Sequence, residues 1–259
     1  MRYALVGHGR MGRAIETAAA DRGHQRVASV DSADVAIDAA SLAGAEVAFE
    51  FTRPEAAASN VLALLAAGVG VICGTTGWSP DRAIDRSAGA AAGGLIVAPN
   101  FSIGVNLFFR MTRQAGRMLA AAGIHQPFVS EMHHRGKLDA PSGTARRLAE
   151  ILIEEDPRLG GMLAGNPDGP LPPDMLQVVS VRAGGEPGTH TVGFDGEQDR
   201  IVLQHSARSR AGFALGAVIG AEWIRDKQGM HGFDEVLDDL LRRNGKSARG
   251  ALGQRGGSG

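Results

Sequence analysis

The chain has 259 residues, of which 44% are hydrophobic and 21% are charged, and its formal net charge is −1. These values are typical of a globular protein with a substantial core, built as one large domain or two smaller ones. The near balance of charge excludes the strongly basic class of proteins and gives no reason to expect a nucleic acid or a membrane surface as a partner.

The only cysteine, Cys73, rules out an internal disulfide. Because the N-terminus also lacks a recognisable signal peptide, we expect a cytoplasmic protein. Cys73 ends an apolar stretch, residues 69–73, so we expect a small core residue and not a nucleophile. The longest apolar run, residues 61–73, is broken by two glycines and is too short to span a bilayer.

The first segment predicts a strand, a glycine turn and a helix. Residues 3–6 form an apolar strand, and a helix over residues 13–22 ends at Gly23. Between them the G-x-G-x-x-G spacing lets backbone amides approach a pyrophosphate at a helix N-terminus. A second strand, residues 25–30, ends at an acid about 20 residues beyond the turn, where a carboxylate can accept hydrogen bonds from a ribose. The expected dinucleotide site comprises Gly7, His8, Gly9, Arg10, Met11, Gly12 and Asp31. The alternative is a glycine turn that only packs a helix onto a sheet.

The residues after the second strand bear on the choice of cofactor. Asp31 is followed by Ser32 with no adjacent arginine, which disfavours a 2′-phosphate and favours NADH over NADPH. Arg10 or Arg53 could still reach a 2′-phosphate, so both cofactors remain open.

Strands and helices continue to alternate as far as residue 97. We expect strands at residues 47–51, 69–73 and 94–97, with helices at 56–67 and from about Pro80, whereas residues 31–46 lack a clear helix. This alternation predicts an α/β, Rossmann-like, doubly wound parallel sheet with ligands at the C-terminal ends of its strands. Two loops lie at such ends: Gly74-Thr75-Thr76 and Ala98-Pro99-Asn100-Phe101. Ordinary βα turns would have the same composition.

Residues 100–106 are a candidate hinge into a second domain. A helix over residues 107–122 and a short strand over 127–130 lead into the motif Glu131-Met132-His133-His134-Arg135-Gly136-Lys137-Leu138-Asp139-Ala140-Pro141-Ser142-Gly143-Thr144. A further helix is expected over residues 145–153.

This motif combines an anion site with groups that exchange protons. Ser142 as N-cap leaves the amides of Gly143 and Thr144 as donors at the positive end of the helix dipole. Lys137 adds a cation, and His133 and His134 titrate near neutral pH. We therefore expect a small carboxylated substrate that is protonated here. The alternative is a solvated basic loop before an ordinary helix start. Adjacent histidines point in different directions and no His-x3-His or Cys pattern supports them, so we expect no metal site.

The string from Glu131 to Ala145 closely resembles the signature of the bacterial dihydrodipicolinate reductases (4-hydroxy-tetrahydrodipicolinate reductases) of lysine and diaminopimelate biosynthesis. The resemblance implies reduction of 4-hydroxy-tetrahydrodipicolinate to tetrahydrodipicolinate, with loss of water, by NADH or NADPH. It implies that His133 is the general acid/base and Lys137 the proton donor. It further implies that loops 74–76 and 98–101 flank the nicotinamide. The implied contacts of the dicarboxylate substrate are His134, Ser142, Gly143 and Thr144. Asp139 is expected to orient the loop.

This sequence departs from the family's pattern beside Asp31, where the family often has a basic residue. The family's usual acid before Phe-Thr is Glu50 here.

The rest of the chain completes a second domain and returns to the first. A long loop is expected over residues 156–174, followed by strands at 178–183, 190–194 and 200–206 and by helices at 211–225 and 233–243. We expect a dinucleotide-binding domain of residues 1–103 and 208–243, and an α+β substrate domain of residues 104–207 with a mostly antiparallel open sheet. Residues 244–259 should be a disordered tail. The family's reductases are commonly tetramers built through such a sheet, which implies a homotetramer.

Two other functions remain as alternatives. An amino-acid dehydrogenase acting on aspartate could share the first 100 residues but would not need the motif at 133–144. A non-catalytic dinucleotide-sensing protein could retain the pocket as a relic, against which the intact His133, Lys137, Gly143 and Thr144 argue.

Overall fold

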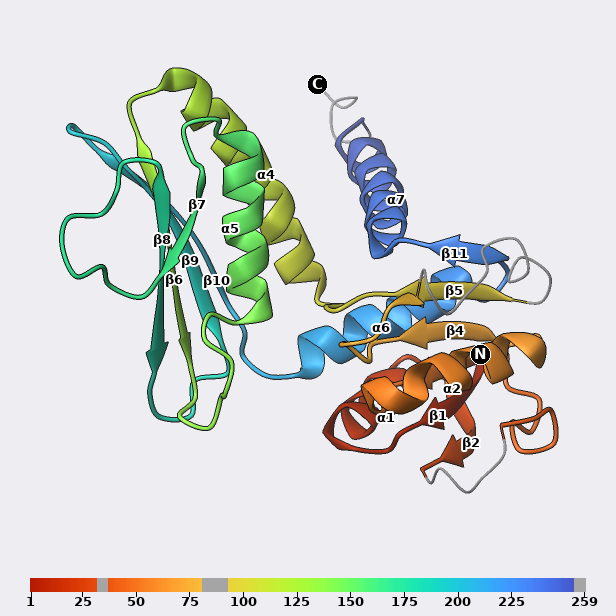
Figure 1. Ribbon diagram of the computed structural model, residues 1–259. Coiled ribbons are helices and arrows are strands. Elements are labelled where there is room, and N and C mark those ends of the chain that lie inside the picture. Colours follow the sequence, from red (N-terminus) through yellow and green to blue (C-terminus); the bar gives the residue numbers. More distant parts are fainter. Residues whose placement is uncertain (32–36, 81–92, 254–259) are drawn as a thin grey trace. The chain divides into compact units, whose positions relative to one another are not determined.

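The computed structural model describes residues 1–31, 37–80 and 93–253, with side chains up to residue 243 (Figure 1). The chain divides into two compact units, Met1–Ile103 with Phe213–Gly259, and Gly104–Gly212. The sequence prediction placed these boundaries after residues 103 and 207. Ser32 and the helix expected after Pro80 lie outside the described residues.

The first unit is built on a parallel sheet with the order β11-β5-β4-β3-β1-β2. Its strands are β1 (Arg2–Val6), β2 (Gln25–Val30), β3 (Val47–Glu50), β4 (Gly70–Cys73), β5 (Gly94–Val97) and β11 (Gly229–His231). Its helices are α1 (Arg10–Asp21), α2 (Pro54–Ala66), α6 (Ala211–Ile224) and α7 (Phe233–Gly253). The doubly wound α/β prediction is confirmed, and β11 is a strand that the prediction missed.

Alternation along β1 explains how this sheet is covered on both faces. Tyr3 and Leu5 belong to a core with α1, α6 and α7, whereas Ala4 and Val6 belong to another core with α2. Successive side chains of a strand point to opposite faces, so a strand with no polar residue inside it must be buried on both. The carboxyl ends of the parallel strands therefore lie at one edge, between two layers of helices.

The second unit is a five-stranded sheet with the order β10-β9-β6-β8-β7. Its strands are β6 (Gln126–His133), β7 (Gly161–Ala164), β8 (Met175–Arg182), β9 (Thr189–Asp195) and β10 (Arg200–Ser206). The ladders of β9 with β6 and β10 are antiparallel, and those of β8 with β6 and β7 are parallel, so the sheet is mixed.

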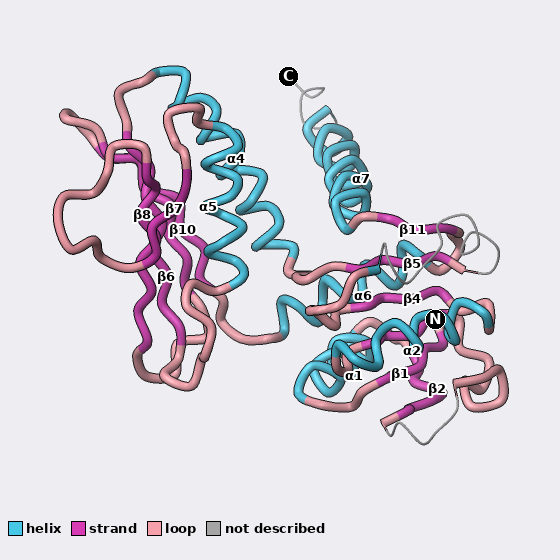
Figure 2. Tube along the Cα trace, viewed as in Figure 1, coloured by secondary structure: helices cyan, strands magenta, loops and turns pink. Residues whose placement is uncertain are grey.

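Helices α4 (Ile103–Ala122) and α5 (Gly143–Glu155) pack on one face of this sheet (Figure 2). Phe108 of α4 and Leu148 of α5 share a core with Val129 of β6. Because side chains alternate along β6, Glu131 and His133 lie on the same face as Val129. Both side chains are buried. A carboxylate and an imidazole therefore extend the core-facing row of an apolar strand.

Two further segments differ from the sequence prediction. The loop predicted over residues 156–174 contains β7, whose four residues pair with β8. The strand is defined by its pairing with β8, and its own sequence does not indicate a strand, because the glycines and prolines around it are typical of a loop. Helix α7 continues to Gly253, past the expected start of a disordered tail at Asn244, and residues 254–259 lie outside the described residues. Over the described part of the chain, no helix is both long enough and apolar enough to cross a membrane.

Candidate functional site

The glycine turn after β1 is shaped for close approach of backbone to backbone. Gly7 has a φ of +91°, and a Cβ at this position would lie 2.4 Å from the carbonyl oxygen of Phe51. A Cβ on Gly12 would lie 2.5 Å from the carbonyl oxygen of Gly7. Helix α1 begins at Arg10, and its N-cap Gly9 offers no side-chain cap. The amides of its first turn are thus left for a ligand, as pyrophosphate binding requires.

Asp31 is held at this turn by the backbone. Its Oδ1 accepts a hydrogen bond of 2.8 Å from the amide of His8, and His8 Nε2 lies 2.8 Å from Glu16 Oε2. Arg13 also reaches the turn, where its Nη1 donates to the carbonyl of His8 at 3.4 Å. The arrangement places the Asp31 carboxylate beside the glycine turn.

A cavity of about 380 Å³ lies at the carboxyl ends of the strands of the first unit. Its lining residues are Met11, Phe51, Thr52, Pro54, Gly74, Thr75, Thr76, Pro99, Asn100, Phe101 and Phe213. The structure therefore brings together Met11 and both loops predicted to flank a nicotinamide. Of the two loops, only Ala98 lies outside the lining, and it is buried in the core.

A fully buried carboxylate, Glu50, connects two residues of the cavity lining, Thr52 and Thr75. It accepts hydrogen bonds from the hydroxyls of Thr52 and Thr75, the amide of Asn60 at 3.2 Å and the thiol of Cys73 at 3.2 Å. Thr75 Oγ1 in turn accepts the backbone amide of Thr52 at 2.8 Å. Burial, followed by the charge of Glu50, raises the pKa of Cys73, so its sulfur remains a protonated donor. Cys73 is a buried core residue, as predicted.

In the second unit Ser142 caps α5. Its Oγ accepts the amide of Ala145 at 3.2 Å, and α5 begins at Gly143. A Cβ added to Gly143 would meet nothing within 4 Å, so this glycine leaves the first turn open. The prediction of a Ser142 N-cap is confirmed, and its geometry leaves the amides of Gly143 and Thr144 as donors for an anion.

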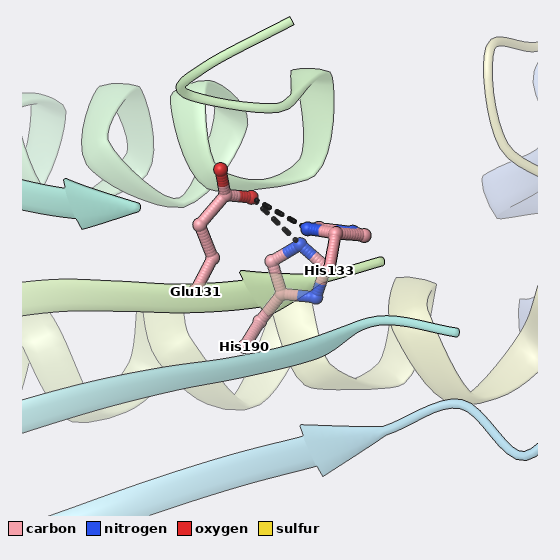
Figure 3. A group of neighbouring side chains, drawn as sticks. All are labelled: Glu131, His133 and His190. Atoms are coloured by element: carbon pink, nitrogen blue, oxygen red, sulfur yellow. Dashed lines mark ion pairs between the residues drawn. The ribbon is translucent and has the colours of Figure 1, made fainter. Parts of the chain in front are cut away.

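Glu131 is the centre of a cluster of polar side chains from β6, β8, β9 and the start of α5. Its Oε1 accepts from the Ser142 amide at 3.0 Å, the Ser180 hydroxyl at 2.7 Å and Arg182 Nη2 at 2.9 Å, and its Oε2 accepts from the Ser142 hydroxyl. His133 Nδ1 lies 3.3 Å and His190 Nε2 3.5 Å from Oε2 (Figure 3). Burial opposes ionisation of Glu131, but hydrogen bonds from His190, Ser142, Arg182 and Ser180 outweigh it and hold its pKa well below the usual range.

His133 is buried and uncharged near neutral pH. Burial lowers its pKa to about 4, and nearby His190, Lys137 and Arg182 add to this effect, whereas Glu131 opposes it. The His133 and His190 rings meet edge to face, with centroids 5.0 Å apart. A neutral imidazole can accept a proton, and it can donate one only after its pKa has been raised.

The loop between β6 and α5 carries the remaining predicted residues. Lys137 Nζ pairs with Asp139 Oδ1 at 2.6 Å, and this hydrogen bond lowers the pKa of Asp139. The Lys137 amide donates to the carbonyl of His134 at 3.1 Å, which closes a turn. In the structure Asp139 thus contacts Lys137 within the loop that it was expected to orient.

Sequence reasoning assigned no role to Glu131 and missed Ser180, Arg182 and His190. The alternation along β6 could have placed Glu131 beside His133, but the other three residues come from β8 and β9 and carry no local signal. Ligand atoms of Glu131, His133 and His190 all lie within 4.8 Å of one another, which is a set that could hold a metal ion. This set was not predicted, because the expectation of no metal site rested on the adjacent pair His133 and His134 alone.

Known proteins match both parts of the chain. The family models "Dihydrodipicolinate reductase, N-terminus" and "Dihydrodipicolinate reductase, C-terminus" match residues 1–101 and 104–237. The 4-hydroxy-tetrahydrodipicolinate reductase of Christiangramia forsetii is 37% identical over 243 residues, covering 93% of this chain and 100% of that protein. Its namesake from Archaeoglobus fulgidus is 37% identical over 260 residues, covering 92% and 100%.

Solved structures share the fold. A dipicolinate-bound dihydrodipicolinate reductase from Paenisporosarcina sp. TG-14 has a TM-score of 0.72 at 24% identity and covers 90% of this chain and 97% of its own. An amine dehydrogenase from Mycobacterium smegmatis has a TM-score of 0.59 at 12% identity, covering 90% and 95%. The family models span both units and the relatives match over their full length, so the chain belongs to the dihydrodipicolinate reductase family, whose members are nicotinamide-dependent oxidoreductases.

Proposed function

We propose that this protein reduces 4-hydroxy-tetrahydrodipicolinate to tetrahydrodipicolinate, with loss of water, in the biosynthesis of diaminopimelate and lysine. The observation that carries the proposal is the open first turn of α5, which is joined by one short loop to Lys137 and His133. An anion site beside proton-exchanging groups fits a dicarboxylate that takes up a hydride and a proton. The names of the relatives support the same reaction.

The first unit would hold the nicotinamide cofactor, which supplies the hydride when bound. Its pyrophosphate fits the turn at Gly7 and the uncapped start of α1, and Asp31 suits the ribose hydroxyls. The residues of the 380 Å³ cavity, among them Thr75 and Asn100, would receive the nicotinamide. We propose a preference for NADH, because Asp31 and Glu16 put two carboxylates on the glycine turn.

In the second unit, the amides of Gly143 and Thr144 would hold one carboxylate of the substrate, with Ser142 fixing the turn and His134 as a further contact. Lys137 adds a positive charge once its ammonium leaves Asp139. Two carboxylates near His133 would raise the pKa of this imidazole from about 4 and make it an effective general acid. For each hydride received, one proton is consumed and the substrate hydroxyl leaves as water. His133 and Lys137 would supply this proton.

The test is cofactor oxidation in a coupled reaction. The protein is added to a dihydrodipicolinate synthase reaction, and oxidation of NADH and of NADPH is followed in parallel. We expect oxidation that requires both the synthase and this protein, and faster turnover with NADH. A folded protein that oxidises neither cofactor contradicts the proposal, and faster turnover with NADPH contradicts the preference alone.

The role of His133 has a matched control. His133→Gln should lower turnover by about 10²-fold or more, the usual range for a general acid–base group. His231→Gln makes the same change at a histidine paired with Glu235 in the first unit and should leave turnover unchanged. Turnover near that of the wild type in folded His133→Gln would show that His133 is misassigned.

We also propose that the protein is a homotetramer joined through the sheet face opposite α4 and α5. Met132 and Val181 are register partners on this face, and Val202 projects from β10 on the same side. These apolar side chains are 40%, 42% and 50% exposed. An apolar sheet face of this kind favours association. Light scattering should give the mass of four chains, and Val181→Asp together with Val202→Asp should lower it. A monomeric wild type contradicts the proposal.

A further inference from the structure

Glu131 precedes the proposed acid/base residue by two positions on β6, and neither the motif chemistry nor the proposed reaction gives it a task. We propose that Glu131 is a positioning residue that fixes the Nδ1–H tautomer of His133 and joins this ring to the anion-binding start of α5. The inference rests on the proposed function for its effect on turnover. Its structural part, the tautomer, can be tested without substrate.

The surroundings of the His133 ring determine which of its nitrogens carries the proton. Its Nδ1 faces Glu131 Oε2 at 3.3 Å, and within the described part of the chain this nitrogen makes no regular hydrogen bond. A carboxylate can only accept, so the nitrogen that faces it must carry the proton of the neutral imidazole. Nε2 lies on the side of Gly188, where a Cβ would come within 2.9 Å of it. The tautomer set by Glu131 leaves the lone pair on Nε2, the nitrogen that can receive and return a proton.

Glu131 is itself held in place by hydrogen bonds. Three donors, the Ser142 amide, the Ser180 hydroxyl and Arg182, converge on Oε1 at 2.7 to 3.0 Å. They fix the plane of the carboxylate. Oε2 is left facing the two imidazoles. Glu131 thus presents a fixed negative charge to Nδ1, as a carboxylate does when it orients a functional histidine from behind.

Glu131 also connects His133 to the anion site at the start of α5. The same carboxylate accepts both the amide and the hydroxyl of Ser142, and the Ser142 hydroxyl caps the amide of Ala145. His190 contacts both partners of Glu131: its Nε2 lies 3.2 Å from Ser142 Oγ, and its ring packs edge to face on His133. One side chain therefore sets the position of His133 relative to the first turn of α5, where a substrate carboxylate would bind.

The ligand atoms of Glu131, His133 and His190 have a spacing that could also hold a metal ion, but the other contacts of the carboxylate argue against a bound ion. Separations of 3.3 and 3.5 Å from Oε2 to the two imidazole nitrogens would suit ligands of one ion. However, Arg182 already balances the charge of Glu131 at 2.9 Å, and the Ser142 hydroxyl donates to Oε2. A divalent ion would displace this donor and lie close to a guanidinium.

The experiment reads the tautomer of His133 by nitrogen NMR of protein labelled in histidine, without substrate and near neutral pH. His133→Gln identifies the resonances. In the wild type, we expect Nδ1 protonated and Nε2 unprotonated. In Glu131→Gln, whose amide can donate to Nδ1, we expect the other tautomer to become populated, with kcat lowered about 10- to 100-fold. The KM for NADH should not change. Glu131→Asp, which keeps the charge, should restore the wild-type tautomer in part.

Glu197→Gln is the matched control. It makes the same substitution at an exposed side chain in the turn between β9 and β10, and we expect no change in tautomer or kcat. A protonated Nε2 in the wild type would overturn the inference, even where Glu131→Gln does not fold. So would an unchanged tautomer in folded Glu131→Gln. Stoichiometric Zn²⁺ that shifts the His133 and His190 resonances together would replace the inference with a metal site. A wild-type protein with the expected tautomer but no reductase activity would refute the proposed function alone.

Discussion

Binding of the substrate should take up protons, because His133 is neutral in the free protein. With a pKa of about 4, roughly one His133 side chain in a hundred is protonated at about pH 6. A dicarboxylate bound at the first turn of α5 would bring negative charge to this ring and raise its pKa. If the pKa rises above the pH of the experiment, each binding event takes up about one proton.

Isothermal titration calorimetry with pyridine-2,6-dicarboxylate, an unreactive dicarboxylate, can count these protons. The observed enthalpy is measured at about pH 6 in buffers of different ionisation enthalpy, and its slope against that enthalpy gives the number taken up. Affinity should improve about tenfold for each pH unit of decrease while the pH lies between the bound and free pKa of His133 and above the range in which the ligand itself takes up a proton. His133→Gln should bind with little proton uptake.

Two results would refute this reasoning. Tight binding with no proton uptake in the wild type would mean that His133 stays neutral in the complex and cannot be the acid. Equal uptake in His133→Gln would place the proton on another group, and His134 would then be the residue to replace.

Three further outcomes are expected. The pKa of His133 lies below the value of 6.5 for an unperturbed histidine, so its contribution to stability is present above pH 6.5 and is lost as the pH falls towards 4, by up to about 3 kcal/mol. Circular dichroism should show this loss in the wild type and a flatter pH profile in His133→Gln; parallel profiles would contradict it. Gly7→Ala should lower NADH affinity at least about tenfold, because φ is +91° and the added Cβ would meet Phe51. Gly169→Ala is the control, because it lies in an exposed loop of the second unit and its Cβ would meet nothing within 4 Å. Equal affinities of the two variants, measured by calorimetry, would refute the role of the turn. Thr75→Val should destabilise the first unit by about 1–3 kcal/mol, because Glu50 loses a buried donor and the Thr52 amide its acceptor. Urea unfolding checks this value, with the exposed Thr17→Val as control.

The parallel sheet was predictable because its signals are local. The strand before Gly7, the turn itself and the acid at the end of β2 are contiguous in the chain, and each restricts the backbone in a way that single residues reveal. The start of α5 was equally accessible, since Ser142 is followed directly by the helix that it caps. Family resemblance added the roles of His133 and Lys137, which remain predictions.

The features that the sequence did not predict depend on pairing between strands that are distant in the chain. Strand β7 has only four residues and is defined by its partner β8, and β11 is defined by β5. The environment of His133 depends on Arg182 and His190, whose strands join β6 only in the folded sheet. No spacing in the sequence predicts that these side chains converge on one carboxylate, or that burial keeps His133 uncharged.

Cys73 gives the protein a built-in probe of motions around the cofactor cavity. It is the only thiol of the chain, is fully buried and is held by Glu50, directly before the loop that begins at Gly74. A thiol reagent can reach it only when the ends of β3 and β4 separate, so the rate of labelling measures the free energy of that local opening. Labelling slowed by a bound dinucleotide would report how far the cofactor closes this edge of the sheet, without any introduced label.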